Sequence, residues 1–386
     1  MRESALEPAG ENSMRFLMAG GGTGGHVIPA LAVASELKAR GHEPYFVGTR
    51  TGLEARLVPA AGFPLEFVKI GGLKRVGALK TVRTLWQLPL GTLLIAFAMG
   101  RRRPAAVFSM GGYAAGPAVI AAWLRRIPIV LMEPNAVPGM TNRWIGRVAA
   151  RALIGFEETA GFFRPGSAEL TGVPVRPEFF EIQPKPRGDT INVLVTGGSR
   201  GSRTLNSGLR ASWTLFRGAG FPVRFLHQTG QEAHAAMLRD FGVVGLQGEI
   251  VPFIDDMPAA FAGADLVICR AGAGAIAELG AAGKPAVLVP FPHAADEHQK
   301  KNAEIMERAG AARMVRDHEF TGRRAFEEIM LLASQPGLFE KMGQAARRFA
   351  RPGAAARAAD ILEELAAGKG ACAAEGGVCD KKVGIL

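Results

Sequence analysis

Short apolar runs that favour β-strands alternate with helical stretches along nearly the whole chain. A strand, a loop and a helix repeated in this order predict parallel sheets with helices on both faces. In the first half the strand candidates are Arg15–Ala19, Pro44–Val47, Leu65–Val68, Ala106–Met110, Ile129–Leu131 and Ala152–Ile154. In the second half they are Ile191–Thr196, Val223–Gln228, Glu249–Val251, Leu266–Cys269, Ala286–Val289 and Ala312–Val315. The fold class predicted from this pattern is α/β.

The two halves of the chain begin with similar motifs. RFLMAGGGTGGH opens the first and INVLVTGGSRGS opens the second, and in each a strand runs into Gly-Gly-(Thr/Ser)-x-Gly. With 386 residues the chain is long enough for two domains, each with its own core. We therefore expect two Rossmann-like, doubly wound domains that face a cleft, because ligands of open α/β sheets bind beyond the carboxyl ends of the strands.

The segment from Arg176 to Thr190 is rich in proline and charge and is the predicted domain boundary. The expected divisions are a disordered lead-in at 1–13, a first domain at 14–175, a second domain at 176–338 and a disordered tail at 368–386. The lead-in lacks a secretory signal, and Met14 is an alternative start. Three cysteines without metal spacing or an even framework favour a reduced, cytoplasmic compartment.

The glycines of the first motif let backbone N–H groups approach a ligand closely, and the loop leads into a helix N-terminus, which favours anions. The motif has neither the Gly-Lys-(Ser/Thr) ending of a Walker A loop nor a good GxGxxG. A dinucleotide site would also need an acidic residue at the end of the second strand, where this chain has Val47-Gly48-Thr49. These observations count against NAD, and a tight strand–helix turn without a ligand stays open as the alternative.

Polar residues follow several strands of the second half. In the second glycine loop, the Ser199 hydroxyl and neighbouring N–H groups are suited to hold a phosphate. Arg270 lies at the end of a strand, and Glu278 on the following helix is suited to bridge two ribose hydroxyls, with a solvated helix glutamate as the alternative. Phe253 and Ile254 offer an apolar ledge for a base, or else the end of a core strand.

A later strand–helix loop is crowded with side chains that hydrogen-bond to sugars: His293, Asp296, Glu297, His298, Gln299 and Asn302. A metal site there is only weakly indicated, because two histidines with interspersed acids are not a specific metal spacing. In the first domain a proline-rich loop carries Glu133 and Asn135, and Arg176 near the boundary can reach the cleft.

The net charge of +11 is concentrated in one segment. Residues 67–132 contain ten basic side chains and no Asp or Glu, which indicates an anionic partner: a membrane surface, a nucleic acid or a phosphorylated substrate. Within this segment the uncharged run Thr84–Gly100 is short for a spanning helix and is flanked by arginines. We expect it to lie on anionic lipid, with a buried core helix as the alternative. No nucleic acid is expected as a partner, because the charges are not interleaved with stacking aromatic residues.

Six motifs together resemble the MurG family of glycosyltransferases: GGTGGHVIPALAVASEL, MEPNAVPGMTNRW, GVPVR, TGGSRGSRTLN, VPFIDDMPAAFAGADLVICRAGAGAIAE and HAADEHQKKNA. The resemblance implies a GT-B type fold and an inverting, UDP-GlcNAc-dependent hexosyltransferase of peptidoglycan synthesis. The implied reaction transfers N-acetylglucosamine (GlcNAc) from UDP-GlcNAc to the 4-hydroxyl of undecaprenyl-pyrophosphoryl-MurNAc-pentapeptide, which converts lipid I to lipid II. A peripheral place on the cytoplasmic face of the bacterial inner membrane is implied as well.

The resemblance also implies which residues bind the substrates. They are Phe253 and Ile254 for the uracil, Arg270 near it, Glu278 for the ribose hydroxyls, Ser199 for the donor phosphate, Gln299 and Asn135 for the GlcNAc sugar, Arg176 nearby, and Thr23, Gly24 and Gly25 in the first loop. The family often has Gln where Pro134 stands here, which puts contacts from that position in doubt. A terminal helix over Phe339–Leu365 is expected to cross back to the first domain.

The reaction needs a base for the attacking hydroxyl, and His26 is the candidate because an unperturbed imidazole has a pKa of about 6.5. The alternative is that His26 only orients the acceptor. The second loop and its helix dipole can stabilise the departing UDP without a metal or another cofactor. The first loop would then face the acceptor and cradle its pyrophosphate. Two other enzymes of this architecture, a diacylglycerol glycosyltransferase and a sugar-nucleotide epimerase, remain alternatives.

Overall fold

The computed structural model describes residues 13–21, 24–67, 92–93, 95–97, 99–112, 115–184 and 188–374. The chain divides into two compact units. Unit 1 comprises Met1–Pro134, Pro138–Pro174 and Gly353–Leu386, and unit 2 comprises Asn135–Val137 and Val175–Pro352. The long segments therefore separate at Pro174, next to the start of the proline-rich boundary that the sequence predicted.

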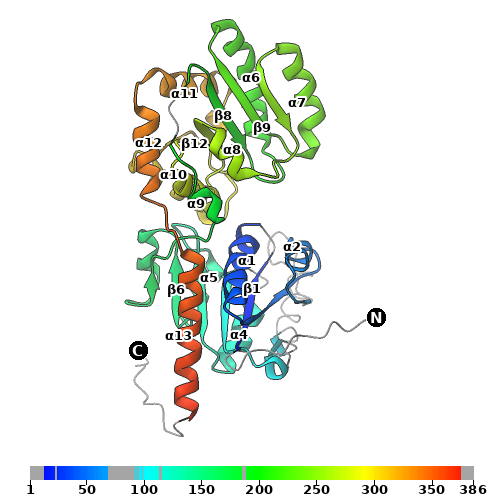
Figure 1. Cartoon of the computed structure of the whole chain (residues 1–386), viewed down its shortest axis with the longest axis vertical. Coiled ribbons are helices and arrows are strands. Elements are labelled where there is room, and N and C mark those ends of the chain that lie inside the picture. Colours follow the sequence, from blue (N-terminus) through cyan, green and yellow to red (C-terminus); the bar gives the residue numbers. More distant parts are fainter. Residues whose placement is uncertain are drawn as a thin grey trace. The chain divides into compact units, whose positions relative to one another are not determined.

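The described part of unit 1 forms a parallel sheet in the order β3-β2-β1-β4-β5-β6-β7. Figure 1 labels β1 and β6 of this sheet. Its strands are β1 (Arg15–Gly20), β2 (Glu43–Gly48), β3 (Leu65–Phe67), β4 (Ala106–Gly111), β5 (Ile129–Glu133), β6 (Arg151–Ile154) and β7 (Ala168–Glu169). Its helices are α1 (Gly24–Ala39), α2 (Glu54–Ala60), α4 (Gly116–Leu124), α5 (Met140–Ile145) and α13 (Ala354–Ala374), with a 3-10 turn η1 (Glu157–Phe162).

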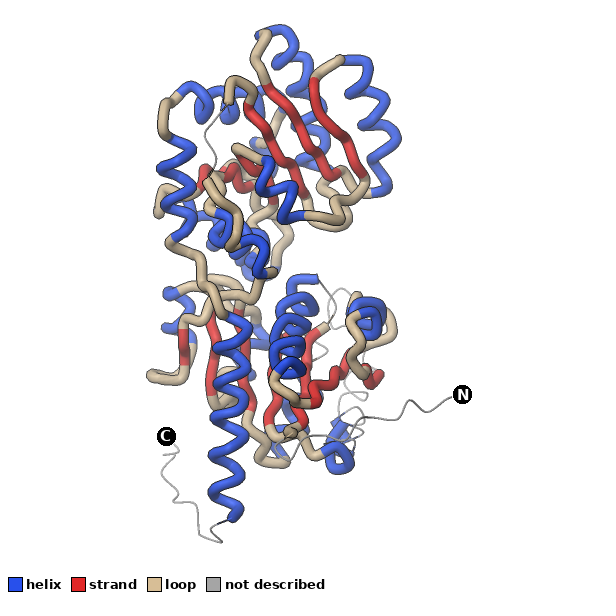
Figure 2. The backbone as a smooth tube through the Cα atoms, in the orientation of Figure 1, coloured by secondary structure: helices blue, strands red, loops and turns tan. Residues whose placement is uncertain are grey.

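Both faces of this sheet are apolar, as expected of a parallel sheet between helices (Figure 2). Successive side chains of a strand point to opposite faces. Phe16 and Met18 of β1 thus join the core under α1 and α13, whereas Leu17 and Ala19 join the core under α4. Two separate cores follow from one nearly continuous apolar strand sequence.

Unit 2 repeats the architecture with a parallel sheet in the order β10-β9-β8-β11-β12-β13 over its described residues. Its strands are β8 (Ile191–Thr196), β9 (Val223–Gln228), β10 (Gln247–Val251), β11 (Leu266–Cys269), β12 (Ala286–Leu288) and β13 (Ala312–Met314). Its helices are α6 (Arg203–Ala219), α7 (Gln231–Val244), α8 (Met257–Gly263), α9 (Ala273–Ala282), α10 (His298–Arg308), α11 (Gly322–Ser334) and α12 (Leu338–Arg347), with 3-10 turns η2 (Pro177–Phe179), η3 (Ala295–Glu297) and η4 (Asp317–Glu319).

The predicted fold class is confirmed, and each of the twelve predicted strands is present with small differences at its ends. The sequence missed β7, which has only two residues. Residues 1–12 of the predicted lead-in and 375–386 of the predicted tail lie outside the described residues, as do 68–91 of the basic segment. Residues 92–93, 95–97 and 99–102 are helical.

The predicted helix over Phe339–Leu365 is wrong as a single element, because it forms two helices. Helix α12 belongs to unit 2, and α13 belongs to unit 1. Pro352 and Gly353 separate the two helices. Proline cannot continue a helix, and Gly353 has a φ of +76°, a left-handed backbone that glycine adopts easily. Helix α13 continues to Ala374, so the tail predicted to be disordered from residue 368 begins as helix.

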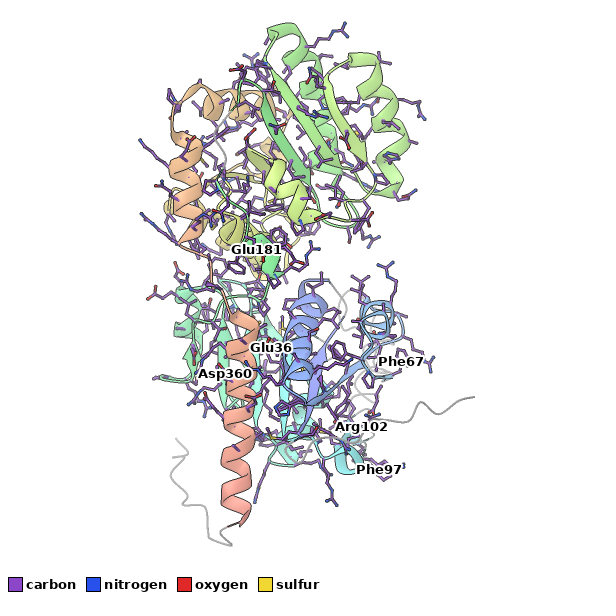
Figure 3. All side chains as sticks on the ribbon, viewed as in Figure 1. Glu36, Phe67, Phe97, Arg102, Glu181 and Asp360 are labelled. Atoms are coloured by element: carbon purple, nitrogen blue, oxygen red, sulfur yellow. The ribbon has the colours of Figure 1, made fainter. Side chains whose placement is uncertain are left out.

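Helix α13 completes unit 1 by packing along α1. Ile361 and Leu362 of α13 are almost fully buried in the core beside β4. At the end of α1, Arg40 forms ion pairs with Glu36 at 2.9 Å and with Asp360 of α13 at 2.7 Å (the two acids are labelled in Figure 3). The last described helix of the chain is therefore part of the core of the first unit.

Candidate active site

The second glycine loop joins β8 to α6 in unit 2. Gly198 and Gly201 adopt left-handed backbone, with φ of +83° and +72°. The N-cap of α6 is Ser202, whose hydroxyl accepts a hydrogen bond from the Leu205 N–H at 3.3 Å. Ser199, which the sequence placed at the mouth of this helix, lies earlier in the exposed loop. Its hydroxyl is therefore not used as the helix cap.

One buried side chain connects this loop to the apolar ledge. Gln228 at the end of β9 is 1% exposed, and its amide nitrogen donates to the Gly198 carbonyl at 2.8 Å. Its amide oxygen accepts from the Ile254 N–H at 2.9 Å. Phe253, beside Ile254, is 52% exposed and does not belong to the core, which argues against the core-strand alternative. The sequence showed Gln228 only as the last residue of a predicted strand.

A second buried chain of hydrogen bonds supports the same loop. The amide nitrogen of Asn206 donates to the Thr229 carbonyl at 2.9 Å, so its oxygen is left to accept from Nε2–H of His227 at 3.0 Å. Burial lowers the pKa of His227 to about 3, so this imidazole is neutral. A Cβ atom at Gly201 would lie 1.9 Å from the Thr229 carbonyl oxygen. The close approach of the loop therefore requires glycine.

Arg270 is held at the carboxyl ends of β11 and β12. Its guanidinium donates to the Val289 carbonyl at 3.0 Å and forms an ion pair with Asp317 in η4. Asp317 in turn accepts from the Thr204 hydroxyl of α6 at 3.0 Å. Arg270 is thus fixed near Phe291, 5.5 Å from its ring centroid. Sequence reasoning did not single out Asp317.

Glu278 on α9 is partly buried, and burial raises its pKa to about 7. The nearby Arg176 guanidinium counteracts part of this increase, so the structure brings these two predicted residues together. Arg176 itself lies just before η2, with its guanidinium over the Phe179 ring at 5.4 Å. A shifted pKa and a positive neighbour argue against a simple solvated helix glutamate.

Asn302 of α10 holds Asn135, one of the residues predicted to contact the sugar. It is fully buried, and its amide donates to the Asn135 side chain and to the Ala271 carbonyl, both at 3.1 Å. Its oxygen accepts from the Ala136 N–H at 2.9 Å. Residues 135–137 consequently belong to unit 2. Gln299, one turn earlier on α10, accepts from the Phe291 N–H at 2.9 Å.

A metal site has no support within the described ranges, where no group of three or more His, Cys, Asp or Glu side chains is placed to hold an ion. Asp296 and Glu297, which belong to the loop where the sequence indicated a metal only weakly, have φ of +53° and +52°. Glu297 forms an ion pair with Lys300.

The first glycine loop joins β1 to α1 in unit 1. Thr23 lies outside the described residues, while Gly24 and Gly25 are the first residues of α1. His26 follows in the first turn, and its Nδ1 lies 3.2 Å from the Gly21 carbonyl oxygen. The ring also lies against Gly112 beyond β4, where a Cβ atom would be 3.4 Å from Cε1. Glu133 is buried and accepts from the Asn142 amide at 2.8 Å.

Two parallel-sheet units, the second with this polar cluster at the carboxyl ends of its strands, have the architecture of a two-domain glycosyltransferase, and the family comparison identifies the chain as one. The model of the glycosyltransferase family 28 N-terminal domain matches residues 16–154, and that of the family 28 C-terminal domain matches residues 192–365. The chain belongs to this family, and within it to the UDP-N-acetylglucosamine–N-acetylmuramyl-(pentapeptide) pyrophosphoryl-undecaprenol N-acetylglucosamine transferases.

The similarity spans nearly the whole chain. It is 60% identical over 351 residues to the transferase of that name from Solibacter usitatus (strain Ellin6076), covering 91% of this chain and 96% of the relative. It is 41% identical over 356 residues to the Myxococcus xanthus (strain DK1622) protein of the same name, covering 91% and 93%. The crystal structure of Acinetobacter baumannii MurG matches with a TM-score of 0.77 at 31% identity, covering 91% of this chain and 99% of that one. The resemblance found in the sequence is confirmed.

Proposed function

We propose that this chain transfers GlcNAc from UDP-GlcNAc to the 4-hydroxyl of MurNAc in undecaprenyl-pyrophosphoryl-MurNAc-pentapeptide, with inversion at the anomeric carbon. The reaction belongs to peptidoglycan synthesis. The family membership supports the choice of donor and acceptor. The observation that carries the proposal is the Gln228 side chain, which ties the loop bearing Ser199 to the ledge formed by Phe253 and Ile254. A nucleoside diphosphate donor needs one site for its phosphates and one for its nucleobase, at a fixed separation.

The donor roles that the family resemblance implies are proposed for residues of unit 2. Phe253 and Ile254 are proposed to take the uracil and Glu278 to accept from the ribose hydroxyls, with the positive charges of Arg176 and Arg270 nearby. The N–H groups of the second loop and the N-terminus of α6 stabilise the charge that develops on the departing UDP. Asn135 and Gln299, both anchored around α10, are the proposed contacts of the sugar.

His26 is the proposed general base for the attacking hydroxyl. The Gly21 carbonyl can only accept, so the proton of a neutral imidazole in this hydrogen bond is on Nδ1. The lone pair is then on Nε2, the atom that takes the proton from the acceptor. The first loop, with Thr23, Gly24 and Gly25, is proposed to receive the acceptor and its pyrophosphate.

A transfer assay tests this function. UDP-GlcNAc with a radiolabelled sugar is incubated with a short-chain lipid-linked muramoyl-pentapeptide, and the linkage of the product is determined by NMR. We expect a β-1,4-linked disaccharide on the lipid. Transfer to a diacylglycerol in place of the muramoyl lipid, or epimerisation of the donor without transfer, would contradict the proposal.

We also propose that unit 1 binds an anionic membrane surface, through residues 67–132 and α5. No helix among the described residues is long and apolar enough to cross a bilayer. Helices α4 and α5 pack against each other and expose Trp123 (57%) and Trp144 (63%). Arg147 stacks over Trp144 at 4.4 Å, and Arg125 and Arg126 follow α4. Exposed tryptophans beside arginines suit the interface of an anionic bilayer. The sequence had not identified the α5 contribution.

Vesicle flotation tests this second proposal. Binding to anionic vesicles should exceed binding to neutral vesicles, and the variant Trp123→Ser/Trp144→Ser should bind less to both. The matched control is Val243→Ser on α7 of unit 2, where an exposed apolar side chain is also removed. Equal binding of all three proteins to anionic vesicles would contradict it.

A further inference from the structure

A carboxyl group lies directly behind the first glycine loop and has no part in the reaction described above. Glu54, the first residue of α2, is 0% exposed. Its Oε1 accepts hydrogen bonds from the backbone N–H and from the hydroxyl of Thr49, each at 2.9 Å. Thr49 follows β2 directly, so the Glu54 side chain turns back to the carboxyl end of that strand.

Three glycines enclose this carboxyl group. A Cβ atom would lie 2.5 Å from Oε1 at Gly21, 2.5 Å from Cγ at Gly48 and 2.0 Å from Oε2 at Gly52. Atoms that are not bonded do not pack this closely, so each position needs a glycine while Glu54 is in place. The first loop, the end of β2 and the turn before α2 therefore converge on one side chain.

Gly21 also connects this group to His26. Its carbonyl oxygen is the partner of His26 Nδ1 at 3.2 Å. The residue whose α-carbon rests against Glu54 is thus the residue that orients the imidazole ring. The contacts form a continuous path from Thr49 through Glu54 and Gly21 to His26.

We propose that Glu54 is a positioning residue for His26: it fixes Gly21, and Gly21 holds the ring as the Nδ1–H tautomer. The proposal rests on the role of His26 as base given under the proposed function. An acid does lie near the end of β2 in the folded chain, but it is Glu54, which comes from α2. In dinucleotide-binding domains an acid near this place binds the ribose, whereas Glu54 is buried and its Oε1 is bound to Thr49.

Two variants test the proposal by different routes. Glu54→Gln keeps the shape of the side chain and removes its charge, and Gly52→Ala places a methyl group where Oε2 lies. We expect each to lower kcat by roughly tenfold to a hundredfold, as for a small misplacement of a catalytic group. The KM for UDP-GlcNAc should stay within about twofold, because uniform donor binding is untouched.

Matched controls come from the same chain. Glu328→Gln alters another buried acid, on α11 of unit 2, and Gly116→Ala alters a glycine with nothing within 4 Å of the added atom. Neither should change kcat. Thr49→Val removes only the hydroxyl donor to Glu54 and should give a smaller loss than Glu54→Gln.

The tautomer of His26 provides a readout that does not depend on activity. With ¹⁵N-labelled histidine, and His26→Ala to assign the signal, NMR should show Nδ1–H in the wild type and a mixture of tautomers in Glu54→Gln and Gly52→Ala. An unchanged tautomer with wild-type kcat in both variants would overturn the proposal. If His26→Ala turns over normally, the base assignment fails, while the tautomer shift still decides whether Glu54 positions the ring.

Discussion

Each glycine loop follows an interior strand of its unit, β1 or β8, and leads into a helix, but the side chains packed behind the two loops differ. Behind the first loop is the carboxyl group of Glu54, enclosed by glycines and bound to Thr49. Behind the second are neutral groups, the Gln228 amide and the Asn206–His227 pair. In the first loop, Gly21 packs on Glu54 and hydrogen-bonds to the His26 ring. In the second, Gln228 hydrogen-bonds to backbone groups of the loop and of the ledge at Phe253.

This difference indicates a division of labour between the loops. A loop that only binds needs its backbone held at a fixed distance from the base-binding ledge, which Gln228 provides. A loop that takes part in the chemistry must also fix the tautomer of a side chain, which the Gly21 carbonyl provides. Lesions of the first loop should therefore reduce turnover, and lesions of the second should reduce donor affinity.

The largest effect is expected at His26. Replacing it by alanine removes the proposed general base, which typically contributes about a hundredfold to ten-thousandfold. Steady-state kinetics of His26→Ala should show this loss in kcat, with donor KM nearly unchanged. Turnover close to that of the wild type would overturn the assignment of His26 as the base.

A glycine pair separates backbone strain from collision in the second loop. Gly198 and Gly201 both have positive φ, but only at Gly201 would a Cβ atom collide with the Thr229 carbonyl. Gly198→Ala should cost about 1 kcal/mol of strain, and Gly201→Ala should weaken UDP binding by more, about tenfold to a hundredfold. Calorimetric titration with UDP measures the UDP affinity of both variants. Equal affinities in the two variants would mean that the contact with Thr229 does not shape the loop.

Donor binding should depend on pH through Glu278. Its pKa is raised to about 7 by burial, and the ionised form is the one proposed to accept from both ribose hydroxyls. UDP affinity should therefore rise as the pH increases through 7 and fall as the group is protonated below it. The change is about tenfold for each unit by which bound donor lowers this pKa. Glu278→Gln should bind more weakly and lose the dependence, and a flat wild-type profile would exclude this role.

The smallest effect is expected at Ser199. Its hydroxyl lies in the exposed loop and is proposed to donate one hydrogen bond to the donor phosphate. Losing such a bond costs about 0.5–1.5 kcal/mol, so Ser199→Ala should weaken UDP about twofold to tenfold. Ser207→Ala on α6 is the control, because that exposed hydroxyl bonds to the Arg203 carbonyl of its own helix. A loss as large as that of Gly201→Ala would contradict a single-bond role.

The fold and the loops could be predicted because their signals are local. An apolar run with glycines at its end predicts a strand and a turn wherever it stands in the chain. The break at Pro352 and Gly353 is a local signal too, and it contradicts the predicted continuous helix over 339–365. The sequence is helical on both sides of the break, so it does not indicate that the chain passes from unit 2 to unit 1 there.

The supports of the site could not be predicted, because their partners are distant in sequence. Gln228 meets Gly198 and Ile254 only once three elements have packed. Asn302 looked like a sugar ligand, yet its amide group is buried and holds residues 135–136. Glu54 could not be predicted as a support because it lies five residues beyond Thr49 in the sequence and returns to the end of β2 only in the folded chain.

The division of labour between the loops is tested most directly by titrating UDP-GlcNAc, without acceptor, into the wild type, His26→Ala and Gln228→Leu. We predict that His26→Ala binds the donor as tightly as the wild type, and that Gln228→Leu binds it about tenfold or more weakly, because two backbone segments lose their common hydrogen-bond partner. Weaker binding by His26→Ala together with unchanged binding by Gln228→Leu would contradict this assignment of the donor to the second loop.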